Sequence, residues 1–194
     1  MEAHRAVERL MAGNARFADG NPDPHRADPA LRTKLADGQT PFACIVTCSD
    51  SRVPPEILFD QSLGDLFVVR VAGTILTPEV IGSVEFAVEQ LHVPLVVVMA
   101  HSRCGAVAAA IAETPLTGAL AAVIDRLKPF VAPVKAAGLT GTALESEVSR
   151  RNTRNLIAAL QTESPAIAAA VQTNTVELHR VYYDIATGRV DWDF

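Results

Sequence analysis

Two short stretches of the chain carry side chains that can do chemistry. The first, "CSDSR", places a thiol at Cys48, a carboxylate at Asp50 and a guanidinium at Arg52. The second, "HSRC", places an imidazole at His101 and a thiol at Cys104, three positions later. Taken alone, these groups fit a loop without function, a redox site or part of a metal site. The surrounding sequence helps to choose among the three.

Each stretch directly follows an apolar run that resembles a buried strand. "FACIVT" precedes Cys48, and "PLVVVMA" precedes His101. In an open parallel sheet the carboxyl ends of the strands meet at one edge, where ligands bind. We therefore expect Cys48 to lie near His101 and Cys104. Two thiolates with one imidazole favour zinc over magnesium or calcium, and three protein ligands leave a tetrahedral zinc the open position of a catalytic site.

The third cysteine, Cys44, is predicted to be a small buried residue and not a ligand. It lies four residues before Cys48 in an apparent strand, which separates the two by about 13 Å. Thiolates that share one zinc are only about 4 Å apart. A metal-free redox pair of Cys48 and Cys104 is an alternative from another class. It is disfavoured because Cys-x-x-Cys is absent and because the carboxylate of Asp50 raises the pKa of a neighbouring thiol.

The elements that must position these residues are of the α/β kind. Residues 42–50, 66–72 and 94–101 form short apolar, β-rich runs typical of buried parallel strands. Residues 77–92 and 102–113 read as helices that follow the second and third of these runs. The closing segment, 175–194, contains the turn "DIATG" and predicts a terminal strand and hairpin. We expect three layers: a central, mostly parallel sheet, flanking helices and an antiparallel C-terminal edge strand.

The totals bound the organisation and the partners. A chain of 194 residues is long enough for one domain with a sizeable core. We assign residues 1–38 to an N-terminal helical arm and 39–194 to a single α/β domain. The formal charge of −5, without a basic block, argues against a nucleic-acid partner. The charged N-terminus and the short apolar runs predict a soluble, cytoplasmic protein without a membrane span.

Four motifs together resemble the β-class carbonic anhydrases. They are "CSDSR", "DLFVVRVAG", "GSVEFAV" and "HSRCGAV", in this order over about residues 39–108. The resemblance implies a zinc-dependent enzyme that reversibly hydrates carbon dioxide to bicarbonate and a proton through zinc-bound hydroxide. It also implies a homodimer or a larger even-numbered homo-oligomer, in which the arm of residues 1–38 packs on a neighbouring subunit. It carries the zinc ligands onto Cys48, His101 and Cys104, and the catalytic pair onto Asp50 and Arg52.

The chemistry of these groups gives each a role within that resemblance. Bound zinc lowers the pKa of its water toward neutrality, as is known for carbonic anhydrases with three histidine ligands. Two thiolates offset the ion's charge, so neighbouring groups matter more here. Asp50 would orient the hydroxide, and Arg52 would hold Asp50 through a bidentate pair. If that pair breaks, Asp50 becomes a fourth zinc ligand in an inactive state, an on/off exchange that the resemblance also implies.

The resemblance extends to substrate-side residues. Gln39 matches a substrate-side glutamine, Phe67 and Phe86 would be apolar walls of the carbon dioxide pocket, and Gly73 would offer a backbone amide. Phe67 and Phe86 are equally compatible with a place in the core. Ile45 stands where one subgroup of the family has the tryptophan of a regulatory bicarbonate site. We therefore expect no such inhibitory site in this chain.

Two further functions fit the same residues. A related enzyme would hydrolyse another linear heterocumulene, carbon disulfide or carbonyl sulfide, on the same zinc, and would differ only in its access tunnel and assembly. A zinc-stabilised binding module without activity is the other, against which the intact pair Asp50 and Arg52 argues. The sequence leaves open the substrate preference, the catalytic rate and the number of subunits beyond two.

Overall fold

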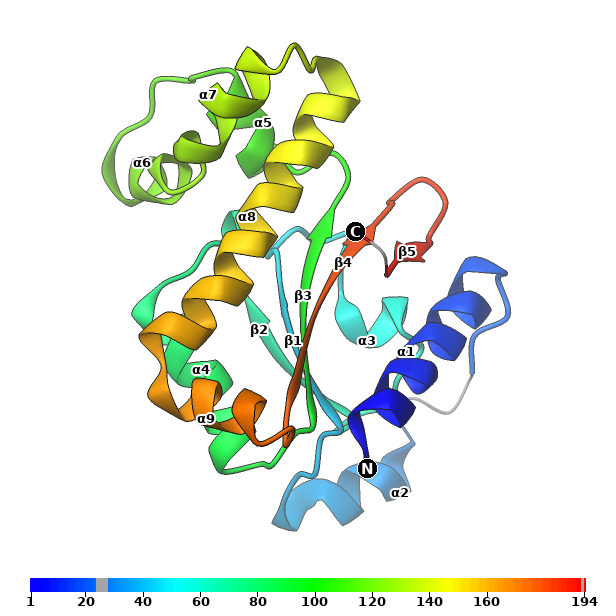
Figure 1. Cartoon of the computed structure of the whole chain (residues 1–194). Helices are drawn as coiled ribbons and strands as arrows, with labels where there is room; N and C mark the ends of the chain where they lie inside the picture. The colour runs from blue at the N-terminus through cyan, green and yellow to red at the C-terminus, as the bar shows by residue number, and fades with distance from the viewer. Residues whose placement is uncertain (24–27, 193) are drawn as a thin grey trace.

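A computed structural model shows the architecture of the chain and describes residues 1–23, 28–192 and 194. Its centre is a five-stranded sheet in the order β2-β1-β3-β4-β5 (Figure 1). Strands β1 to β4 are parallel, and β5 runs antiparallel to β4 at the edge. The elements are α1 Ala3–Ala18, α2 Pro29–Lys34, η1 Leu35–Asp37, β1 Ala43–Thr47, α3 Pro55–Leu58, β2 Leu66–Arg70, η2 Ala72–Thr74, α4 Pro78–Glu89, β3 Leu95–His101, α5 Gly105–Ile111, α6 Gly118–Asp125, α7 Lys128–Ala136, α8 Gly141–Glu163, α9 Pro165–Gln172, β4 Glu177–Tyr183 and β5 Val190–Asp191.

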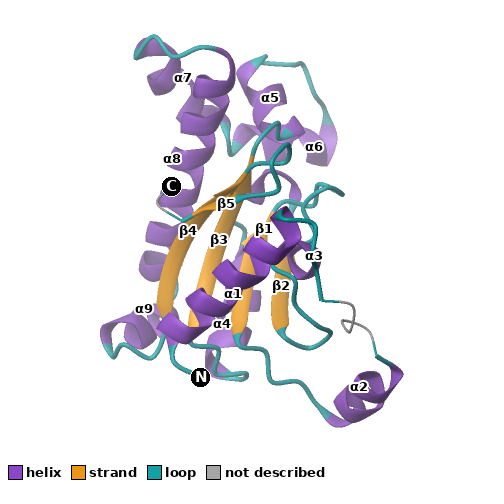
Figure 2. Cartoon of the chain, turned by 90° about the vertical axis from the view of Figure 1, so that its right-hand side faces the viewer, coloured by secondary structure: helices purple, strands orange, loops and turns teal. Residues whose placement is uncertain are grey.

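Helices cover both faces of the sheet and produce the predicted three layers. Helices α1 and α3 lie on one face, and α4, α8 and α9 lie on the other, while α5 to α7 extend beyond the carboxyl ends of the strands (Figures 1 and 2). Alternate strand residues serve the two faces. Ile45 and Val97 pack in the cluster with α1, and Val46 and Val98 pack in the cluster with α4 and α8.

The two central strands bring the two chemical stretches to one edge. Every residue of β1 and of β3 is buried, because each is paired on both sides and covered on both faces. Thr47, the last residue of β1, lies opposite Met99 of β3 in the register. Its hydroxyl donates a hydrogen bond to the Met99 carbonyl at 2.9 Å. The chain segments that leave β1 and β3 therefore start side by side.

The arm of residues 1–38 packs, in its first helix, on its own chain. Ala6 and Leu10 of α1 are fully buried against the sheet. Asn14 donates to the carbonyls of Leu58 and Gly188, which joins α1 to the last residue of α3 and to the C-terminal hairpin. Contact of the arm with a second subunit stays a prediction, and residues 24–27 of the arm lie outside the described residues.

No helix among the described residues is both long enough and apolar enough to cross a bilayer.

Candidate metal centre

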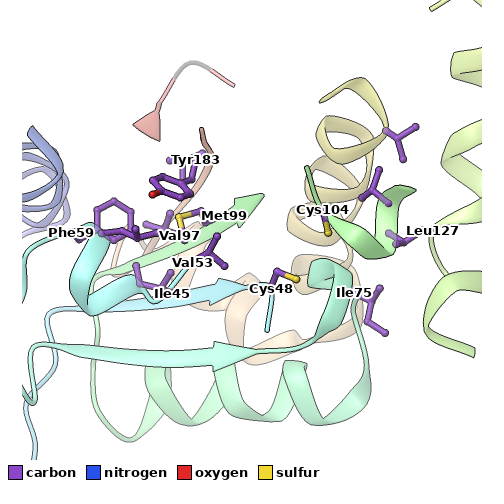
Figure 3. Packing of buried hydrophobic residues seen from close by; sticks show 14 of the residues in the cluster. Ile45, Cys48, Val53, Phe59, Ile75, Val97, Met99, Cys104, Leu127 and Tyr183 are labelled. Atoms are coloured by element: carbon purple, nitrogen blue, oxygen red, sulfur yellow. The ribbon is translucent and has the colours of Figure 1, made fainter. Parts of the chain in front are cut away.

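Three side chains form a compact donor group at the carboxyl edge of the sheet. Cys48 follows the end of β1 and Cys104 directly precedes α5 (Figure 3). His101 is the last residue of β3. One donor atom from each lies within 4.8 Å of the other two, and all three residues are buried. The structure thus brings these residues together, as their positions at neighbouring strand ends predicted. Whether these three residues can bind a metal ion depends on the chemistry of their donor atoms.

The imidazole of His101 is arranged as a metal ligand would be. Its Nδ1 lies 2.9 Å from the Ser102 carbonyl, which requires the ring proton on Nδ1 and leaves a lone pair on Nε2. His101 is only 2% exposed, and its Nε2 has no hydrogen-bond partner in the described part of the chain. A buried nitrogen without a partner costs stability unless something binds it. A metal ion held with two sulfurs satisfies it, and this donor set fits zinc.

The two thiols of the group act as one coupled pair. The pKa of Cys48 is lowered, contrary to the rise expected from the neighbouring Asp50 carboxylate. The main cause is a hydrogen bond from the Cys104 thiol, and the backbone amides of Asp50 and Gly73 add to it, while burial opposes the shift. The pKa of Cys104 is raised, because it is the donor in that bond and is buried. The two thiols therefore titrate as a pair and not independently. A bound divalent cation would displace the proton that Cys104 donates.

Cys44 is separate from this group. It is fully buried in the other core cluster, on the opposite face of the sheet. Burial raises the pKa of its thiol to about 12, so it stays protonated and unreactive. The prediction that Cys44 is a small buried residue is confirmed, and Cys44 lies outside the donor group; that it is not a ligand stays a prediction.

A tight turn in η2 supplies a hydrogen bond to the donor group. The backbone N–H of Gly73 donates to the Cys48 sulfur at 3.3 Å. Gly73 has a φ of 71°, and a Cβ there would lie 3.0 Å from a Leu127 methyl and 3.1 Å from the Ala106 Cβ. Glycine is thus required both by the backbone and by space. We expected this amide to face substrate; in the structure it faces the sulfur, because the left-handed turn directs it there.

Asp50 and Arg52 form the bidentate pair that the sequence predicted. Arg52 donates from Nε to Oδ1 at 2.9 Å and from Nη2 to Oδ2 at 2.6 Å, and its backbone N–H adds a bond to Oδ1 at 3.0 Å. Arg52 holds the pKa of the Asp50 carboxyl far below its usual range. The same Nη2 donates to the Arg103 carbonyl at 3.1 Å, so Arg52 joins the two chemical loops. Asp50 lies outside the three-residue donor group.

Two residues that support this site were not identified from the sequence. Arg70, at the end of β2, donates to the carbonyls of Cys48 at 3.0 Å and Asp50 at 2.5 Å, and so fixes the backbone of the first loop. Its place at the same strand edge was a usable signal. Asn152 of α8 donates to two carbonyls of the η2 turn. Its setting in the polar helix segment "RRNTRN" offered no signal.

The other predicted substrate residues lie away from the donor group of their own chain. Gln39 precedes β1, at the amino edge of the sheet. Phe67 of β2 lies opposite Cys44 of β1 in the register, and Cys44 is four residues before Cys48. Phe86 of α4 is 48% exposed, and its ring centroid is 6.0 Å from that of Phe67. Their role in a pocket stays a prediction.

Comparisons with known proteins agree on one family. A family model described as carbonic anhydrase matches residues 43–190. The carbonic anhydrase of Mycolicibacterium smegmatis is 39% identical over 191 residues, which cover 96% of this chain and 91% of that protein. Carbonic anhydrase 2 of Mycobacterium tuberculosis is 39% identical over 188 residues, which cover 95% and 89%.

Solved structures give the same result for the fold. A chain from the crystal structures of two tetrameric β-carbonic anhydrases of the filamentous ascomycete Sordaria macrospora superposes with a TM-score of 0.77 at 28% identity, covering 97% of this chain and 94% of that one. The β-carbonic anhydrase CcaA superposes with a TM-score of 0.76 at 31% identity, covering 95% and 93%.

Proposed function

Because the chain belongs to the β-class carbonic anhydrase family, we propose that it is a zinc-dependent carbonic anhydrase that converts carbon dioxide and water into bicarbonate and a proton, and back. The observation that carries the proposal is the buried donor group of Cys48, His101 and Cys104 with its unpartnered imidazole nitrogen. These three residues would hold the zinc. When bound, zinc lowers the pKa of a coordinated water toward neutrality and so supplies the nucleophile.

The Asp50–Arg52 pair has two tasks in this proposal. Arg52 keeps Asp50 ionised and turns both carboxylate oxygens toward itself, away from the donor group. An ionised carboxylate can still accept one more hydrogen bond, since each oxygen has two lone pairs. Asp50 would accept it from the attacking oxygen and so direct a lone pair of that oxygen at the substrate carbon. Release of Asp50 from Arg52 would let it occupy the fourth ligand position and close the site.

The substrate pocket is completed, in this proposal, by a second copy of the chain. The predicted pocket residues, Gln39, Phe67 and Phe86, lie toward the amino edge. Phe67 is in register with Cys44, and Cys44 is about 13 Å from Cys48 along β1. The surface near them exposes large apolar side chains, among them Phe86 at 48% and Leu63 at 49%, which is typical of an interface. We infer a homodimer or a larger even-numbered assembly, and the tetrameric Sordaria macrospora relatives support this.

The cellular setting follows from the thiols. All three cysteines are free, and a reducing compartment keeps them so. We therefore place the protein in the cytoplasm. The buried positions of Cys48 and Cys104, each 5% exposed, disfavour the alternative of a metal-free redox sensor, because reactive sensor thiols are accessible.

Metal analysis combined with stopped-flow carbon dioxide hydration tests the proposal. The wild type is expected to hold one zinc per chain and to hydrate carbon dioxide, and Cys48→Ser is expected to do neither. A zinc-free wild type without hydration activity would overturn the proposal. Carbon disulfide and carbonyl sulfide are assayed in parallel, and faster turnover of either than of carbon dioxide would favour the heterocumulene hydrolase instead.

A further inference from the structure

The turn that contacts the Cys48 sulfur has a strained backbone. Two consecutive residues, Gly73 with a φ of 71° and Thr74 with a φ of 50°, lie in the left-handed region. Glycine adopts that region freely, but a β-branched threonine does so only at a cost in energy. Such a conformation persists when the surrounding structure imposes it. Contacts from outside the turn must therefore hold Thr74 and Gly73 in place.

Asn152 of α8 provides that hold. The side chain is 6% exposed, and its amide nitrogen donates to the carbonyls of Gly73 and Thr74, both at 3.1 Å. Both amide hydrogens are thus used on two adjacent peptide units. Because a buried carbonyl without a partner is costly, loss of this amide would favour rotation of those peptides away from their present orientation.

Rotation of the turn would change the hydrogen bond that the turn donates to the donor group. The Gly73 N–H that faces the Cys48 sulfur belongs to the same turn as the two carbonyls held by Asn152. A hydrogen bond to a ligand sulfur fixes the direction of its lone pairs and withdraws charge from it, which changes how it binds a metal.

We propose that Asn152 is a positioning residue of the metal centre. By holding the η2 turn, it keeps the Gly73 amide directed at Cys48 and so sets the strength and geometry of metal binding by that sulfur. The proposal rests on the proposed function, because it takes Cys48 to be a ligand. It adds a residue that lies outside the donor group and 79 positions from the turn it holds.

A second buried asparagine offers a matched control. Asn14 of α1 is also 6% exposed, and its amide nitrogen also donates to two carbonyls, those of Leu58 at 3.1 Å and Gly188 at 2.9 Å. It joins α1 to the end of α3 and to the C-terminal hairpin, and neither contact involves the donor group. Replacing either asparagine by leucine removes two donated bonds from a similarly buried position; at Asn14 it also removes the bond that Oδ1 accepts from the Val190 N–H at 2.9 Å, so Asn14→Leu is the more demanding control for stability.

The test compares cobalt binding by the wild type, Asn152→Leu and Asn14→Leu. Cobalt(II) reports its own ligands, since thiolate coordination gives a charge-transfer absorption in the near ultraviolet. Metal affinity is measured by competition with a chromophoric chelator. For Asn152→Leu we expect an affinity about 10- to 100-fold weaker than that of the wild type, with a shifted charge-transfer band. Asn14→Leu is expected to lose stability but to keep the wild-type affinity and spectrum.

Further variants keep the test decisive if Asn152→Leu does not fold. Asn152→Gln retains the amide and is expected to recover part of the affinity. In Thr74→Gly, whose turn is less strained, replacement of Asn152 is expected to cost less affinity. Equal affinities for Asn152→Leu and the wild type, or equal losses for both asparagine variants, would overturn the proposal. A wild type that binds cobalt without the thiolate band would instead refute the proposed function.

Discussion

The two edges of the central sheet differ in how much of a site one chain builds. At the carboxyl edge, the donor group of Cys48, His101 and Cys104 is buried and assembled. At the amino edge and on the adjoining surface, Phe67 and Phe86 form an aromatic pair that is open on one side. A metal centre needs donors fixed within a few tenths of an ångström, and here one chain brings all three donors together. A pocket wall tolerates assembly from two chains.

Hydrogen bonds across loops account for the order of the carboxyl edge. Arg52 donates to the Arg103 carbonyl and so ties the loop after β1 to the turn after β3. Arg70 holds the backbone of the first loop from β2. These contacts join three strand ends around the donor group.

The largest effect is expected from a ligand cysteine compared with the structural one. Cys104→Ser removes one of the sulfurs and is expected to abolish stoichiometric zinc binding and to reduce hydration to the background rate. Cys44→Ser puts a hydroxyl in an apolar cluster and is expected to cost about 1–3 kcal/mol of stability, with zinc and activity retained. Zinc content, stopped-flow hydration and urea unfolding measure these effects. Loss of zinc from Cys44→Ser would contradict the assignment of the donors.

A smaller loss is expected when Asp50 is released. Arg52→Met removes both side-chain bonds to the carboxylate, and we expect kcat/KM to fall about 10- to 100-fold while zinc stays bound. A variant that loses activity but keeps its zinc would show that Asp50 and Arg52 act on catalysis and not as metal ligands. The matched control, Asp50→Asn in the Arg52→Met background, cannot close the site as an anionic ligand. An Asp50 that remains off the zinc in a crystal structure of Arg52→Met would exclude the proposed exchange.

At the amino edge the expected effect is smaller and leaves the metal untouched. Phe67→Ala is expected to lower kcat/KM about tenfold, because it removes an apolar wall from the assembled pocket. Zinc content should equal that of the wild type. Leu120→Ala, at an exposed position of α6, is the control and should behave as the wild type does. A Phe67→Ala variant with full activity and an unchanged oligomeric state would show that this edge is not part of the pocket.

The smallest effect is expected in the pH dependence of the folding stability, through Asp184 in the C-terminal hairpin. The backbone N–H of Thr187 donates to Asp184 at 2.8 Å and is the main reason that the pKa of Asp184 is lowered. A lowered folded-state pKa stabilises the fold above the unfolded value of about 3.8, and this contribution is lost as the pH falls through the folded pKa. At pH 6 the wild type should therefore unfold at a slightly higher urea concentration than Asp184→Asn. A gap that did not narrow below pH 3.8 would contradict this.

Much of the fold and of the donor group followed from local pattern. Continuous apolar runs in β1 and β3 predicted buried parallel strands, and the position of Cys48 and His101 at their ends predicted the shared edge. The single-turn helix α3 and the turn η2 were missed, because elements of three or four residues carry no measurable periodicity. Phe86 is exposed because it lies two positions from Val84, which places it on another face of the helix.

The contacts that support the site could not be predicted from local sequence patterns. Asn152 acts on Gly73 across 79 positions, and such a bond depends on how α8 crosses the sheet. The pair of Asp50 and Arg52 was predictable because the two residues are adjacent in one loop. Residues that act through long-range backbone contacts become visible only in the folded chain.

The central claim is that zinc held by Cys48, His101 and Cys104 makes this chain a carbonic anhydrase. Its most direct test is a zinc titration of the chelator-treated protein, with carbon dioxide hydration followed by stopped flow at each step. We predict that activity starts at the background rate, rises in proportion to added zinc and saturates at one zinc per chain. Full activity before any zinc is added, or saturation with zinc without any hydration activity, would contradict the account.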